Sequence, residues 1–218
     1  MYKALVIKEL RETAWIAVVT LAAYALVVME MMGYSLWSMR WEPVTIIPFQ
    51  YELFAYLSAL IAAACGILIG FRQSAWESLR GTSIFLLHRP LSRRALFGTK
   101  LTAGLGILLI TTGLPLLAYS LWAATPGTHA SPFYWSMTAQ CWFIWFDMTI
   151  AYLAAFLTGI RNARWFGSRL FPLFGALFPV LITLETLPVP GLRWLIVIVA
   201  DAVLLTAIFY VVENRDYP

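Results

Sequence analysis

The stretch RQSAWESLRGTSIFLLHRPLSRRALFGTK, residues Arg72–Lys100, is the one long polar interruption in a chain that is otherwise largely apolar. It carries six basic side chains and separates two uncharged runs, Leu53–Phe71 and Leu101–Ala124. Each run is long enough to cross a bilayer, because about 20 residues of α-helix match the thickness of the hydrocarbon core. We therefore expect this stretch to be a loop at the membrane surface that determines the orientation of the chain.

The composition of the rest of the chain is that of a membrane protein. Of 218 residues, 61% are hydrophobic and 12% are charged, whereas about 25% of the residues in a soluble domain are charged. Four further apolar stretches each contain one carboxylate. The sequence predicts an all-α integral membrane protein with a single domain over residues 1–218. Its six spans are expected at about residues 14–34, 53–71, 101–124, 137–160, 170–187 and 194–212.

Positive charge is distributed on one side of these spans. All of the 15 lysine and arginine residues except Arg40 and Arg193 lie in the N-terminus, the C-terminal tail, or the loops after the second and fourth spans. Basic residues are retained on the cytoplasmic face of a membrane, so both termini are expected inside, and this pattern argues against nucleic acid as a partner. The residues expected to anchor this topology at the lipid headgroups are Arg93, Arg94, Lys100, Arg161 and Arg164.

The first 13 residues have the pattern of an amphipathic helix. Tyr2, Val6, Leu10 and Thr13 fall on one stripe, with charged residues elsewhere. Such a helix could lie in the headgroup layer, with its basic side toward anionic membrane lipid. It could equally be a cytoplasmic extension of the first span, and the sequence leaves both interpretations open.

Within the basic loop, the sequence predicts a short helix parallel to the membrane. Ser74 and Glu77 have the spacing of a capping box, in which each side chain bonds the backbone of the other residue. The residue before a proline avoids the α region, so the helix should end at Arg89-Pro90. Ser92 is then placed to cap the third span.

This loop resembles a known family. Glu77, Gly81-Thr82, Leu86-Leu87, Arg89-Pro90, Ser92-Arg93 and Lys100 are similar to the "E…GT…LL.RP.SR…K" stretch of type-2 ABC transporter permeases, and Lys8-Glu9-Leu10-Arg11 is similar to their N-terminal "KEL.E". The resemblance implies that the loop is a coupling helix that docks on a separate ATPase subunit. The residues expected to couple to the ATPase are Glu77, Arg80, Thr82, Leu86, Arg89 and Pro90. A purely capping role for Glu77 and a purely topological role for Arg89 remain alternatives.

The resemblance also implies a function. No G-x-x-x-x-G-K-[ST] motif occurs in the chain, so ATP and Mg²⁺ would be bound by the partner ATPase and not by this chain. The expected protein is not an enzyme and needs no cofactor of its own. It is half of an exporter in the bacterial plasma (inner) membrane, paired with a second copy or a related permease. A lipid, a drug or a peptide fits equally well as cargo.

Two alternatives belong to other classes of protein. An ATP-independent channel or scaffold subunit is compatible with the same composition. An intramembrane enzyme is disfavoured, because the two histidines, His88 and His129, are expected on opposite sides of the membrane and a nucleophilic or metal site needs clustered groups.

Two carboxylates lie inside expected spans. Asp147 is near the middle of the fourth span, where a charge costs about 2.5 kcal/mol or more, and Asp201 is a weaker case in the sixth. Both are candidates for the translocation route. For Asp147, a protonated acid with one structural hydrogen bond is an equally good interpretation. Asp147 could also be hydrated, or bonded to a hydroxyl of a neighbouring chain such as Thr149 or Tyr152, and the dimer interface is an alternative to the translocation route.

Overall fold

A computed structural model describes residues 2–76, 92–162, 168–185 and 190–214. The predicted coupling residues Glu77, Arg80, Thr82, Leu86, Arg89 and Pro90, and the predicted anchor Arg164, lie outside these ranges. The helices are α1 (Tyr2–Met31), α2 (Leu53–Gln73), α5 (Arg93–Ala123), the 3₁₀ turn η1 (Trp135–Thr138), α6 (Ala139–Asp147), α7 (Thr149–Ile160), α8 (Phe171–Glu185) and α9 (Pro190–Asn214). Two short strands, β1 (Tyr34–Ser35) and β2 (Arg40–Trp41), form an antiparallel hairpin after α1.

The helical class expected from the sequence is confirmed, and the number of spans is confirmed in part. Five helices of the described chain are long and apolar enough to cross a membrane, with Trp135–Ile160 counted as one. The sixth expected span, at 170–187, corresponds to α8, whose described apolar part, Phe171–Thr183, is shorter. This number of apolar helices indicates a multi-pass membrane protein.

The N-terminal segment agrees with one of its two interpretations, a continuous extension of the first span, and not with the other, a separate helix in the headgroup layer. Residues 2–31 form the single helix α1, so the first 13 residues extend the first span and are not a separate amphipathic helix. The stripe that packs inward is also different from the expected one. Leu5, Glu9 and Thr13 are buried, whereas Tyr2 and Leu10 are about half exposed.

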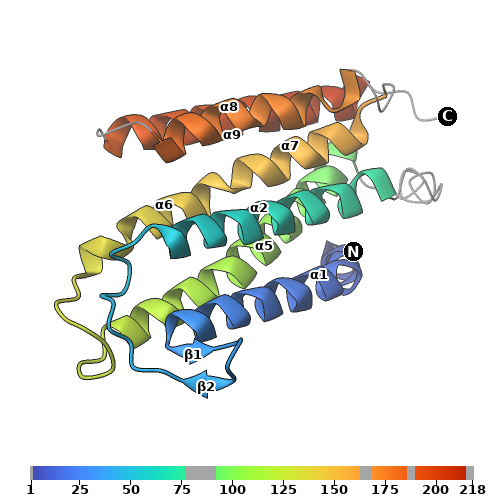
Figure 1. The fold of residues 1–218 in the computed structure, drawn as a ribbon. Helices are drawn as coiled ribbons and strands as arrows, with labels where there is room; N and C mark the ends of the chain where they lie inside the picture. Colours follow the sequence, from blue (N-terminus) through green and yellow to red (C-terminus); the bar gives the residue numbers. More distant parts are fainter. Residues whose placement is uncertain (1, 77–91, 163–167, 186–189, 215–218) are drawn as a thin grey trace.

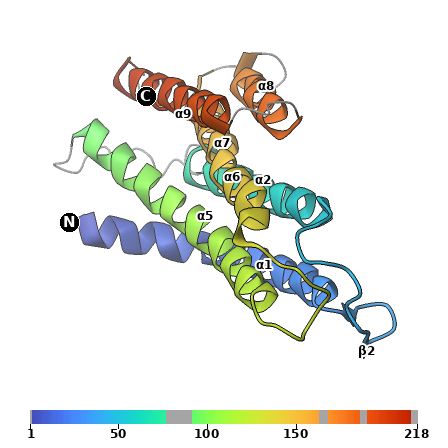
Figure 2. The same ribbon diagram turned by 90° about the vertical axis from the view of Figure 1, so that its left-hand side faces the viewer.

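The helices are arranged in layers around α7 (Figures 1 and 2). Every residue of α7 is buried, as expected of a helix that is apolar on all sides. On one side, α2 and α5 contact α7, and α1 packs on α2 and α5. On the other side, α8 and α9 contact α7 and each other.

The two ends of the bundle differ in chemistry. Figure 1 shows that the start of α1 and the last turns of α2, α7 and α9 lie at the same end of the bundle. We call this the basic end, because the helix termini there carry basic residues, among them Lys3, Lys8, Arg72, Arg94 and Arg161. The β-hairpin lies at the opposite end. Exposed aromatic residues gather near that opposite end, as in an interfacial aromatic belt: Trp37, Trp41, Tyr134 and Trp135.

Candidate functional site

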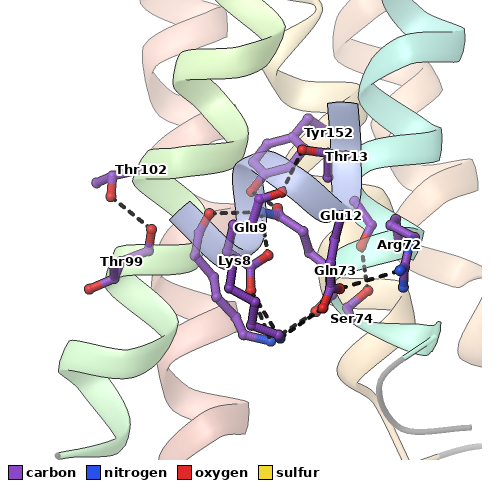
Figure 3. A network of polar contacts seen from close by, with 12 residues as sticks. Lys8, Glu9, Glu12, Thr13, Arg72, Gln73, Ser74, Thr99, Thr102 and Tyr152 are labelled. Carbon is purple, nitrogen blue, oxygen red and sulfur yellow. Dashed lines mark hydrogen bonds and ion pairs between the residues drawn. The ribbon is translucent and has the colours of Figure 1, made fainter. Parts of the chain in front are cut away.

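A buried polar cluster joins four helices at the basic end, with Gln73 at its centre. The Gln73 Nε2 group donates to Glu9 Oε2 of α1 at 3.0 Å and to the Lys100 carbonyl of α5 at 3.1 Å. The Tyr152 hydroxyl of α7 donates to Gln73 Oε1 at 2.8 Å. We call Glu9, Gln73, Lys100 and Tyr152 the Gln73 cluster; Figure 3 shows it in close-up.

The cluster also holds an ion pair that is removed from water. The Lys100 ammonium donates to the Gln73 carbonyl at 3.2 Å and lies 3.9 Å from Glu9 Oε1. Glu9 and Lys100 are each 1% exposed, and Tyr152 is 0% exposed. A buried charge is tolerated when it is paired and hydrogen-bonded, and every polar atom of the Gln73 side chain has a partner. The cluster therefore links α1, α5 and α7 to the last residue of α2.

A second, more exposed set of charges borders the cluster toward the end of the bundle. Glu12 of α1 lies 3.4 Å from the Arg72 guanidinium of α2 and 3.5 Å from the Lys8 ammonium. The Arg72 guanidinium also lies over the Trp76 ring, 5.6 Å from its centroid. The Glu12–Arg72 pair therefore connects α1 to the residue directly before Gln73 (Figure 3).

Glycines allow the helices to approach closely enough for the cluster to form. A Cβ at Gly70 of α2 would lie 2.8 Å from the Tyr152 carbonyl oxygen, and one at Gly66 would lie 3.2 Å from the Tyr152 amide nitrogen. Together with Ala62, these residues form a small-residue stripe at a spacing of four, which is typical of close helix packing in membranes. At Gly104 of α5, a Cβ would overlap Gln73 Oε1 and the Tyr152 hydroxyl.

Removing one hydrogen bond from this cluster should destabilise the fold. We expect Tyr152→Phe to lower the free energy of unfolding by about 1–3 kcal/mol, because Gln73 Oε1 would remain buried without its donor. The measurement is thermal unfolding of the full chain in detergent. Tyr56→Phe is the matched control, since the Tyr56 hydroxyl donates to Glu52 at an exposed site. Equal stability of the two variants would contradict a structural role for the cluster.

The structure corrects the expected location of one anchor residue. Lys100 was expected at the lipid headgroups, but its side chain is buried against α1 and α2. Arg93 and Arg94 are exposed at the start of α5, and the Arg94 guanidinium pairs with Glu213 of α9. The partly exposed Arg161 donates to the Ser168 carbonyl at 2.9 Å.

Of the two expected caps in the basic loop, one is confirmed. The Ser92 side chain accepts a hydrogen bond from the Ala95 amide and caps α5. The Ser74 hydroxyl donates to the Gly70 carbonyl at 2.6 Å, at the end of α2, and Glu77, its expected partner in a capping box, lies outside the described residues.

The intramembrane aspartates have partners within the chain. The hydroxyl of Thr183 in α8 lies 2.9 Å from Asp147 Oδ2, and that of Thr149 in α7 lies 2.7 Å from Asp201 Oδ2, each within hydrogen-bond distance. Within this chain, the hydroxyl near Asp147 thus comes from α8, which packs against α6, and not from Thr149 or Tyr152.

The cavities of the described chain that carry charged lining residues lie away from the Gln73 cluster. One, of about 470 Å³, is an apolar groove between α7, α8 and α9, with Arg161 among its lining residues. The other, of about 550 Å³, lies beside the β-hairpin and includes Glu30 and Glu42. Neither Asp147 nor Asp201 is a lining residue of these two cavities, although both were expected on a translocation route.

From the sequence, Lys100 was expected as a headgroup anchor, Glu9 was named only as part of a motif and Tyr152 only as a possible partner of Asp147. Gln73 was not singled out, and the meeting of these four residues was not predicted. A signal for Glu9 was present in the sequence of α1. Thr13, Thr20 and Tyr24 form a weakly polar stripe along this helix, and Glu9 lies on the same stripe, four residues before Thr13. Gln73 and Tyr152 give no such signal, because the two residues that bond each other are 79 positions apart in the sequence.

No protein-family model, no curated protein and no solved structure matches this chain.

Proposed function

We propose that the chain is the membrane subunit of an ABC exporter, driven by a separate cytoplasmic ATPase. In this proposal, the basic end faces the cytoplasm of a bacterial cell, and α8 completes a set of six spans. Residues 74–92 form the coupling element that docks on the ATPase. A second copy of the chain, or a related permease, completes the translocation unit.

The observation that carries the proposal is the position of the Gln73 cluster. Gln73 is the last residue of α2, directly before the basic segment that resembles a coupling helix. Its side chain and carbonyl hold α1, α5 and α7 by the contacts described above. A movement imposed on that segment would therefore reach three other helices through one residue.

This arrangement suits a transporter that switches as a rigid body. Packed helices with buried, fully satisfied polar contacts move together and not one by one. A push at the end of α2 would carry α1, α5 and α7 with it and change access between two copies of the chain. ATP hydrolysis in the partner supplies the free energy, and this chain supplies the mechanical connection.

The test is association with an ABC ATPase, sought first among the proteins encoded next to this one. The two chains are co-expressed, this chain is purified through a tag in detergent, and the bound ATPase is quantified. We expect the wild-type chain to retain the ATPase, and the charge-reversed variant Glu77→Arg/Arg80→Glu to lose most of it, because both residues lie on the proposed docking element.

The matched control reverses charges at the other end of the bundle. Arg40→Glu/Glu42→Arg changes exposed residues at and beside β2 and should leave ATPase binding unchanged. Binding that is insensitive to the reversal at 77 and 80 would contradict the proposed docking element. Failure of any ATPase to associate with the wild-type chain would favour the ATP-independent channel or scaffold.

A further inference from the structure

Two aspartate–threonine pairs lie between the central helices and the α8–α9 pair. Asp147 of α6 bonds Thr183 of α8, and Asp201 of α9 bonds Thr149 of α7. Asp147 is 0% exposed. The second carboxyl oxygen, Oδ1, of each aspartate is buried and has no hydrogen-bond partner within the described chain.

The number of hydroxyl hydrogens around Asp147 is too small for an ionised carboxylate. A threonine hydroxyl has one hydrogen to donate. The Thr183 hydroxyl lies 2.8 Å from both the Pro179 and the Val180 carbonyl oxygens as well as 2.9 Å from Asp147 Oδ2. An ionised Asp147 would thus share one hydrogen with two carbonyls and receive none at Oδ1.

Asp201 presents the same shortage. The Thr149 hydroxyl lies 2.8 Å from the Phe146 carbonyl oxygen and 2.7 Å from Asp201 Oδ2. If each aspartate is instead a neutral acid, its Oδ2 hydrogen is donated to the threonine oxygen, and the threonine hydrogen goes to the backbone carbonyl. This arrangement uses every hydroxyl hydrogen, and it leaves at Oδ1 an uncharged carbonyl oxygen, which is the cheapest polar atom to leave unpaired.

Counter-charges do not offer an alternative. Two ionised carboxylates at the same junction would repel each other in a medium of low dielectric constant. The described cations on the surrounding segments have other partners: Arg193 with Gln140, Arg161 with Ser168, Arg169 with the Thr158 and Gly159 carbonyls, Arg72 with Glu12, Lys100 with Glu9, and Arg94 with Glu213. The tyrosines and cysteines there carry no positive charge: Tyr152, Tyr119, Cys65 and Cys141.

We propose that Asp147 and Asp201 are two intramembrane proton-binding sites, each holding a proton on Oδ2 that is donated to the threonine of the facing helix. The two protons link α6 to α8 and α7 to α9. Loss of either proton would place an uncompensated charge at the junction and weaken the docking of the α8–α9 pair. This proposal does not depend on an ATPase partner and stands apart from the exporter function.

Infrared spectroscopy of the full chain in detergent tests the proposal, because protonated and ionised carboxyls absorb at different frequencies. At neutral pH, we expect Asp147→Asn and Asp201→Asn each to remove one component from the carbonyl band of protonated acids, and the double variant to remove both. Asparagine is also neutral and can donate to threonine, so these variants retain the contact. The control Glu52→Gln, at an exposed site, should reduce only the ionised-carboxylate band.

A second pair of variants keeps the test independent of the asparagine spectra. Thr183→Val and Thr149→Val leave each acid in place but remove its acceptor, so each acid component should shift to higher frequency without losing intensity. The proposal is overturned if the asparagine variants reduce the ionised-carboxylate band at neutral pH. It is also overturned if the valine variants shift no component of the wild-type carbonyl band of protonated acids.

Discussion

Replacing Lys100 with methionine should lower the free energy of unfolding by roughly 3 kcal/mol, the lower end of the usual range for breaking a buried ion pair. The substitution conserves most of the side-chain volume but leaves Glu9 as a carboxylate that is 1% exposed. The value lies at the lower end because the Lys8 ammonium, 3.5 Å from Glu9 Oε1, compensates part of the lost charge. The measurement is denaturant or thermal unfolding of the full chain in detergent.

Two controls separate this effect from a general loss of positive charge. The double variant Glu9→Gln/Lys100→Met should recover most of the lost stability, because replacing both partners of a buried pair is often close to neutral. Arg94→Met removes an exposed partner of Glu213 and should change stability little. If Lys100→Met is no less stable than Arg94→Met, the buried pair does not support the fold.

The second large effect is expected at Gly70. An alanine Cβ there would lie 2.8 Å from the Tyr152 carbonyl oxygen and 2.9 Å from both the Phe156 amide nitrogen and the Ala155 Cβ. The two backbone atoms belong to a buried helix and cannot rotate away, so α2 must move off α7. We expect Gly70→Ala to cost about 1–3 kcal/mol in the free energy of unfolding, as overpacking usually does.

The matched control for Gly70 is another helical glycine with open space around it. A Cβ at Gly106 of α5 would meet no heavy atom within 4 Å. Gly106→Ala should therefore raise stability by roughly 0.5–1 kcal/mol, because alanine loses less backbone entropy in a helix. Both values come from the same unfolding measurement. Equal stability of Gly70→Ala and Gly106→Ala would show that α2 and α7 are not in close contact.

These two predictions concern the same junction. Gly70 brings α2 against α7, and this contact places Gln73 within reach of Tyr152. Loss of the close approach would therefore also open the Gln73 cluster. If the proposed coupling operates through Gln73, variants at Gly70 and Lys100 should retain ATPase binding, because neither residue belongs to the proposed docking element, and should lose transport.

The inner faces of the helices were harder to predict than their positions along the chain. The start of α1 illustrates this, since its charged and apolar residues alternate closely enough to suggest more than one stripe. The stripe with Tyr2 and Leu10 looked apolar, but the one with Leu5 and Glu9 packs inward. A glutamate is buried there because Gln73 and Lys100 are present on the facing helices to bond it, and the identity of these partners cannot be read from residues 1–13.

The helical membrane class, the places of most apolar helices and the asymmetry of the basic residues could be predicted without a structure. These properties are local, since a run of about 20 apolar residues and a cluster of basic residues are each visible in a single segment. The inward turn of Lys100 to Glu9 and the contacts of Asp147 and Asp201 with threonines of facing helices became visible only in the folded chain. Such partners depend on which helices become neighbours, and that is settled by the packing of small residues between segments far apart in the chain.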